Sequence, residues 1–251
     1  MKFPVIRGLI RRRILVNFRV NPEVIQRLLP DPFKPKLLRG WAMAGICLIR
    51  LEQIRPGWVP APIGLCSENA AHRIAVCWTN QDNQSQEGVY IPRRDSSSLI
   101  NYLVGGRLFP GEHHKATFEV RDDGDAVALS ARGLDDSLSI DLRGHSADSL
   151  PSTSIFAALE EASNFFKFGS LGYSDTSSGT HLDGVILLTE HWKVAPLSID
   201  IARSSYFSDL EKFPEGTAEF DCALIMRNIE HQWQAAPEML TRYPADHSTV
   251  F

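Results

Sequence analysis

Alternating apolar and polar positions, the two-residue period of a half-buried β-strand, recur along most of the chain. The clearest case is residues 114–144, where three alternating segments are separated by Asp-Asp-Gly and by Gly-Leu-Asp-Asp, both turn signals for β-hairpins. This stretch predicts an antiparallel meander. Similar patterns predict further strands over residues 11–20, 40–54, 68–78, 88–92, 184–194, 198–207 and 217–229.

Helical signals occur at only a few places. Asn21 followed by Pro22 is typical of a helix start, with asparagine as the cap and proline in the first turn. Residues 154–169 carry apolar side chains at helical spacing and end in glycine, which predicts the main helix of the chain. A helical turn is also predicted after Asp95, whose carboxylate is a suitable cap.

These elements predict a mainly β protein with minor α structure, built on an antiparallel, partly closed β-barrel. A doubly wound parallel fold would need a helix between successive strands, and the pattern lacks such helices. No internal repeat or low-complexity linker interrupts the 251 residues. We therefore expect a single domain spanning residues 1–251.

Composition narrows the class of protein further. The net charge of −4 and the pI of about 6.1 give no basic excess for nucleic acid. The longest apolar run, residues 41–49, is too short to span a bilayer, and the arginine-interrupted N-terminus does not form a signal peptide. We expect a cytoplasmic protein with no nucleic-acid or membrane partner, and the sequence is compatible with a homo-oligomer. No C-x-x-C pair occurs, and we expect buried, reduced thiols at Cys47, Cys66, Cys77 and Cys222.

The common cofactor and metal motifs are missing from the sequence. No G-x-S-x-G, P-loop or G-x-G-x-x-G is present, and no histidine or cysteine pair has metal-ligand spacing. His113 and His114 are adjacent and point to opposite faces of a strand, so they do not chelate one ion. The acidic residues 122–125 fit a hairpin turn better than a calcium loop. We expect neither a metal nor another cofactor, while nineteen arginines are compatible with an anionic ligand.

Lys115 is the residue with the most interesting chemistry, because it stands alone between Lys36 and Lys167 at the start of a predicted strand. An amine that is kept from water, or crowded by cations, loses its proton and condenses with a ketone to form an imine. Strict alternation puts Lys115 on the polar face with Thr117 and Glu119. That face is either solvent-exposed or the lumen of a barrel, and the pattern allows both.

Residues 88–120, GVYIPRRDSSSLINYLVGGRLFPGEHHKATFEV, resemble acetoacetate decarboxylase and its uncharacterised relatives. That family has a Gly-Arg-Glu motif, then Gly-x-Pro-Lys-Lys, then an alternating strand. The segments RRRILVNFRVNPEVIQRLLPDPF, LEQIRPGW, CSENAAHRIAVCW and TEHWKVAPL extend the resemblance. The resemblance implies a decarboxylase-like barrel with a substrate arginine at Arg11, acidic positions at Glu52 and Glu68, and a motif arginine at Arg107, although Leu108 replaces the motif glutamate.

The match is ambiguous at the lysine pair of the motif. Aligned without a gap, His113 replaces the proline, His114 replaces the imine-forming lysine, and Lys115 matches the neighbouring lysine that activates it. A one-residue slip makes Lys115 the nucleophile, and it also reverses the face to which the side chain points. Both registers stay open at this point.

The hypothesis that follows is a Schiff-base lyase that acts on a small keto acid or related carbonyl compound. A non-catalytic binding barrel for a small carboxylate, or a pocket that uses histidine acid–base chemistry without an imine, is the alternative; a metal-dependent enzyme is a third. Glu68 and Arg73 fall on opposite faces in regular alternation, so a direct pair would need a bulge. The candidate catalytic residues are Lys115, Glu68 and His114, and the candidate substrate-binding residues are Arg11, Arg107, Glu52, Arg73 and His113.

Overall fold

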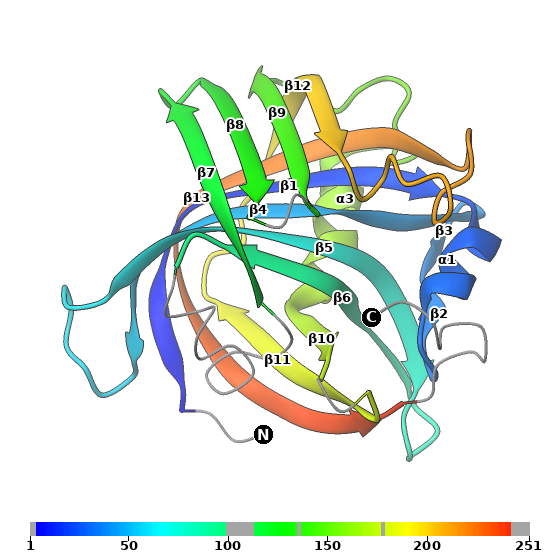
Figure 1. The fold of residues 1–251 in the computed structure, drawn as a ribbon, viewed down its shortest axis with the longest axis horizontal. Helices are drawn as coiled ribbons and strands as arrows, with labels where there is room; N and C mark the ends of the chain where they lie inside the picture. The colour runs from blue at the N-terminus through cyan, green and yellow to red at the C-terminus, as the bar shows by residue number, and fades with distance from the viewer. Residues whose placement is uncertain (1–3, 99–112, 135–136, 177–178, 242–251) are drawn as a thin grey trace.

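The computed structural model describes residues 4–98, 113–134, 137–176 and 179–241, and it is mostly β-sheet (Figure 1). The helical elements are α1 (Pro22–Leu28), α3 (Leu159–Lys167) and the short 3-10 helix η1 (Phe168–Ser170). The strands are β1 (Ile6–Val20), β2 (Lys34–Pro35), β3 (Leu37–Leu38), β4 (Trp41–Pro56), β5 (Leu65–Thr79), β6 (Ser85–Ser96), β7 (His113–Asp122), β8 (Ala126–Gly133), β9 (Ser139–Ser146), β10 (Leu171–Asp175), β11 (His181–Thr189), β12 (Ala195–Ser204) and β13 (Ala218–Leu240).

The long strands close into two rings that share one side. β13, β1, β4, β5 and β6 are neighbours in that order, and β10 and β11 connect β6 back to β13 to close the first ring. β7, β8, β9 and β12 connect the same two end strands on the other side and close the second ring. In Figure 1 the shared strands cross the middle, with β7–β9 above them and β10 and β11 below.

Most of these pairings are antiparallel, and the partly closed barrel that the sequence predicts is confirmed. The exceptions both involve β6, which pairs in parallel with β7 and with β10. A two-residue hairpin cannot join parallel strands, so β6 and β7 need a longer connection. That connection contains residues 99–112, and Arg107 therefore lies outside the described residues.

The structure has two apolar clusters, because the shared strands are buried on both faces. Along β1, Ile14, Val16 and Phe18 belong to the cluster that also contains residues of β8 and β9, while Leu15, on the opposite face, belongs to the cluster that contains residues of α3. A strand buried on both faces reads as a nearly continuous apolar run. The segment WAMAGICLI in β4 has this pattern.

The helix predicted after Asn21 is confirmed as α1, and the Asn21 side chain accepts a hydrogen bond from the backbone amide of Glu23 at 2.8 Å. The helix predicted over residues 154–169 is confirmed, but it starts later, at Leu159. The reason is Asp221 on β13, whose carboxylate binds the Ser154 hydroxyl and the Ile155 amide, both at 2.8 Å. Those contacts hold residues 154–155 outside the helix.

Asp95 lies inside β6, where its carboxylate accepts hydrogen bonds from the Arg93 guanidinium. The helical turn predicted after Asp95 falls mainly on residues 99–112, outside the described residues. The expectation of buried thiols is correct for Cys47 and Cys222 and wrong for Cys66, which is exposed; none of the four cysteines forms a disulfide. β13 also continues far beyond residue 229, because its second half pairs with β11.

Within the described ranges, no helix is long and apolar enough to cross a membrane.

Candidate functional site

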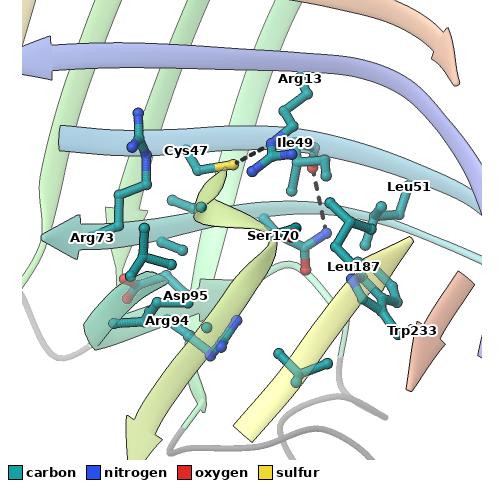
Figure 2. A pocket seen from close by; sticks show the side chains of 18 of the residues that line it. Arg13, Cys47, Ile49, Leu51, Arg73, Arg94, Asp95, Ser170, Leu187 and Trp233 are labelled. Atoms are coloured by element: carbon teal, nitrogen blue, oxygen red, sulfur yellow. Dashed lines mark hydrogen bonds between the residues drawn. The ribbon is translucent and has the colours of Figure 1, made fainter. Parts of the chain in front are cut away.

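A cavity of about 130 Å³ lies inside the first ring, walled mainly by apolar side chains (Figure 2). Strand alternation explains its lining, because every second residue of a ring strand points inward. Cys47, Ile49 and Leu51 of β4 follow this period. The other apolar side chains of the wall are Ala70, Ala71, Val89, Ile91, Val185, Leu187 and Trp233.

Arg73 of β5 is the most deeply buried cation of the cavity, with 6% of its surface exposed. One terminal nitrogen donates to the side-chain oxygen of Asn17, and the guanidinium carbon lies 4.9 Å from the centre of the Phe166 ring. The Nε atom is buried and has no hydrogen-bond partner among the described residues. Burial lowers the pKa of Arg73 to about 10, so the side chain is charged at neutral pH.

Two further arginines line the same cavity. Arg94 of β6 donates from Nε to the Ser174 hydroxyl at 3.2 Å, while its Nη2 atom is buried and has no partner in the part of the chain that the structure describes. Burial lowers the pKa of Arg94 to about 10 as well. Arg13 of β1 donates from Nε to the Cys47 sulfur at 3.2 Å, and Figure 2 shows this contact as a dashed line.

The cavity therefore carries positive charge that the described protein groups do not neutralise. None of these three guanidinium groups forms a salt bridge with a carboxylate of the described residues. Asp95 also lines the cavity, but both of its oxygens accept from Arg93 at 2.8–3.1 Å. An enclosed cation without a counter-ion is costly, so the site favours an anion that enters it.

Comparison with known proteins assigns the chain to a protein family. Residues 9–210 match the family DUF2071, described as "Uncharacterized conserved protein". The chain belongs to DUF2071. No curated protein sequence gives a significant match.

Solved structures similar to this DUF2071 member are acetoacetate decarboxylases and enzymes like them. The acetoacetate decarboxylase of Legionella pneumophila matches with a TM-score of 0.60 at 10% identity, over 94% of this chain and 88% of that one. An acetoacetate decarboxylase-like enzyme of Sphingomonas wittichii matches with a TM-score of 0.57 at 13% identity, over 96% and 94%. The enduracididine biosynthesis enzyme MppR, complexed with pyruvate, gives 0.57 at 7% identity, over 96% and 91%. The fold of this DUF2071 chain is therefore acetoacetate decarboxylase-like, as the resemblance implies.

The structure brings two of the sequence-predicted site residues to the cavity, Arg73 and His113. The described lining includes neither His114 nor Lys115. Lys115 is half-buried and lies two residues after His113 on β7, beside Ser96 of β6. His114 lies between them in the strand and points to the other face.

The structure places the remaining described candidates away from the cavity lining. Glu68 forms an ion pair with Arg12 at 2.8 Å, on the face of the shared strands opposite the cavity. Burial raises the pKa of the Glu68 carboxyl, and the Arg12 charge opposes this shift. Glu52 pairs with Arg11 at 2.9 Å, where half of the Arg11 side chain is exposed.

Sequence reasoning missed most of the lining of the DUF2071 cavity, including Arg13, Cys47 and Arg94. Arg13 belongs to a run of three arginines, and alternation alone does not show which of them faces a lumen when both faces of β1 are buried. Cys47 lies in an almost uninterrupted apolar run. The sequence does place Cys47, Ile49 and Leu51 on one face of the strand. That face is recognised as a cavity wall only when the strands are known to close into a ring.

Proposed function

We propose that this protein binds a small organic carboxylate, a keto acid in particular, in the cavity of the first ring. The observation that carries the proposal is the set of Arg13, Arg73 and Arg94, which line an apolar-walled cavity and form no salt bridge with a described carboxylate. Guanidinium groups bind carboxylates through paired, charge-assisted hydrogen bonds. The Nε of Arg73 and the Nη2 of Arg94 have no hydrogen-bond partner among the described residues, so these side chains retain hydrogen-bonding capacity for such a ligand.

The size of the cavity supports a small ligand. A volume of about 130 Å³ is close to that of cavities that hold a benzene-sized molecule, which is ample for an acid of the size of pyruvate. The apolar wall suits the alkyl end of such an acid. MppR, a protein of similar fold, has been crystallised with pyruvate, which is consistent with this ligand class.

Isothermal titration of the full chain with pyruvate and with its neutral methyl ester tests the proposal. We expect pyruvate to bind and the ester to bind at least about tenfold more weakly, because it lacks the charge that the guanidinium groups recognise. Arg94→Gln should weaken pyruvate binding by about tenfold or more, since it removes one charge-assisted contact.

Arg143→Gln is the matched control, because Arg143 is an exposed arginine on β9 of the other ring. It should leave the affinity for pyruvate unchanged. Equal affinity for the acid and the ester, or a folded Arg94→Gln variant with wild-type affinity, would contradict the proposal.

A Schiff-base lyase at Lys115 is the second candidate function. The observation in its favour is that Lys115 is half-buried and lies on the same side of β7 as His113, a residue of the cavity lining. In this reaction the Lys115 amine adds to the keto carbon and water leaves, which gives an imine. The imine draws electrons from a bond on the neighbouring carbon, which is a C–H bond in pyruvate and the bond to the carboxylate in a β-keto acid. Among the described residues, no lysine lines the cavity itself.

Borohydride reduction in the presence of pyruvate separates the two candidates. An imine at Lys115 gives a reduced adduct on that residue, and the adduct disappears in Lys115→Ala. If pyruvate binds but leaves no adduct on the wild-type chain, the protein is a carboxylate-binding barrel without imine chemistry.

A further inference from the structure

One nucleophilic side chain in the cavity takes no part in the function proposed so far. Cys47 lines the cavity and is 8% exposed, and its sulfur accepts a hydrogen bond from Arg13 Nε at 3.2 Å (Figure 2). The thiolate is the reactive form of cysteine, and a guanidinium donor stabilises negative charge on sulfur.

A second observation at the same cavity is independent of Arg13. Arg73 is 94% buried, lines the same cavity, and has an Nε atom with no hydrogen-bond partner among the described residues. Arg73 therefore retains hydrogen-bonding capacity that the described residues do not use, and its positive charge favours an anion in the cavity that it lines. The thiol of Cys47 is therefore placed where a bound carboxylate would also be.

We propose that Cys47 is a nucleophile that forms a reversible covalent bond with the electrophilic carbon of a carboxylic acid held in this cavity. The inference rests on the proposed carboxylate binding and adds a reacting group and a substrate class to it. The substrate class is an acid whose electrophilic carbon is next to its carboxylate, as in α-keto acids.

The proposed step is an addition and is balanced without any other reactant. The Cys47 sulfur bonds to the keto carbon, and the carbonyl π electrons move to the oxygen. The proton that leaves the thiol ends on that oxygen, which gives a hemithioketal. No atom leaves and nothing is oxidised or reduced, so the reverse step restores the free thiol and the keto acid.

The chain contains its own reference thiol. Cys66 is exposed at the start of β5 and is not part of the cavity lining, so its alkylation reports ordinary thiol reactivity. Both residues are measured in the same sample, which cancels differences in reagent concentration and protein folding.

The experiment compares iodoacetate, an electrophilic carboxylate, with neutral iodoacetamide on the folded full-length chain. Mass spectrometry of peptides follows the alkylation rate of each cysteine. We expect the rate ratio of iodoacetate to iodoacetamide to be at least about tenfold higher at Cys47 than at Cys66, the factor that one additional charge-assisted contact provides. Pyruvate should protect Cys47 and leave the rate at Cys66 unchanged.

The variant Arg13→Gln should remove most of the preference of Cys47 for iodoacetate, while Arg143→Gln should preserve it. If Cys47 reacts no faster with iodoacetate than with iodoacetamide after normalisation to Cys66, or if pyruvate does not protect it, the inference is wrong.

The two proposals fail in different ways. Titration that shows pyruvate binding, together with an unreactive Cys47, overturns the nucleophile alone. No pyruvate binding and no iodoacetate preference overturn the carboxylate site as well.

Discussion

At the scale of single residues, the protein retains buried positive charge where an apolar side chain would serve the fold better. Burial of Arg94 removes water from its guanidinium, and the Ser174 hydroxyl replaces only part of that solvation. Replacement of buried charged groups by apolar ones is often neutral or stabilising. Groups that lower stability and offer donors to a cavity are typical of ligand sites.

Arg94→Met separates these two effects. We expect its free energy of unfolding without ligand to equal or exceed that of the wild type, by up to about 1 kcal/mol, since the methionine needs no counter-ion. The extra thermal stability that millimolar pyruvate gives the wild type should be largely lost. Thermal unfolding with and without pyruvate measures both, and a variant that is still stabilised by pyruvate as strongly as the wild type would argue against a role for Arg94.

His72 gives a pH dependence of stability. It is fully buried on β5, with Nε2 at 3.0 Å from the Ser204 hydroxyl, and burial, helped by the charge of Arg93, lowers its pKa to about 3. The unfolded chain takes up this proton below about pH 6.5. Between about pH 6.5 and 3 the unfolded state therefore binds more protons, so this contribution to stability is lost as the pH falls.

We expect the free energy of unfolding to decrease over this window by up to about 1.4 kcal/mol per pH unit from His72. Urea denaturation at several pH values measures the slope. His72→Gln should reduce it, whereas His145→Gln, which changes an exposed ring on β9, should not. A slope that is unchanged in His72→Gln would show that this residue is not the group responsible.

Sequence reasoning identified some of the individual cavity residues and missed others. It proposed Arg73 and His113, and the structure places both at the cavity. It also selected Arg11 from three consecutive arginines, whereas the arginine of the described lining on this strand is Arg13. Resemblance to a distant family identifies the matching segment more reliably than the exact residue alignment within it. On a strand, an alignment error of one residue moves the chosen side chain to the opposite face.

At the scale of elements, Arg12 connects three strands. Its guanidinium, 4% exposed, pairs with Glu68 of β5 at 2.8 Å and with Asp122 of β7 at 3.3 Å. Asp122 also pairs with Arg227 of β13 at 2.8 Å. The acidic turn after β7 is thereby held to the strands that the two rings share.

Arg12→Leu should destabilise the protein by about 3 kcal/mol, because it leaves two partly buried carboxylates without this partner. The neighbouring substitution Arg11→Gln should cost less than about 1 kcal/mol, since the pair of Arg11 with Glu52 is exposed and solvent-screened. Urea denaturation of the two variants provides the comparison. Similar losses for both would mean that Arg12 has no special part in joining the strands.

Local sequence signals predicted most helices and strands well. Where the observed bounds differ from the predicted ones, the cause is a contact with a residue far away in the sequence. The Asn21 cap and the strands of the meander depend on neighbours in sequence, and the cap and the antiparallel pairing of β7, β8 and β9 are confirmed. The start of α3 depends on Asp221, and the second half of β13 depends on β11. Neither contact has a signal in the segment that it changes.

At the scale of the whole molecule, the two rings share β13, β1, β4, β5 and β6. Loss of either ring exposes one face of these strands and leaves their apolar side chains in water. We therefore expect the described rings to unfold together, which agrees with the prediction of one domain.

Leu129→Ala tests this coupling. Leu129 is a β8 residue of the second ring's apolar cluster, so its truncation should cost about 2–5 kcal/mol. The transition should remain single, with tryptophan fluorescence and far-UV circular dichroism giving the same lowered urea midpoint. Two separated transitions would show that the rings are independent units.

The most direct test of the central claim is a crystal structure of the full chain grown or soaked with pyruvate. The account predicts electron density for the carboxylate inside the first ring, within hydrogen-bond distance of at least two of the guanidinium groups of Arg13, Arg73 and Arg94. A cavity that holds only water at saturating pyruvate, or a pyruvate bound elsewhere on the molecule, would contradict it.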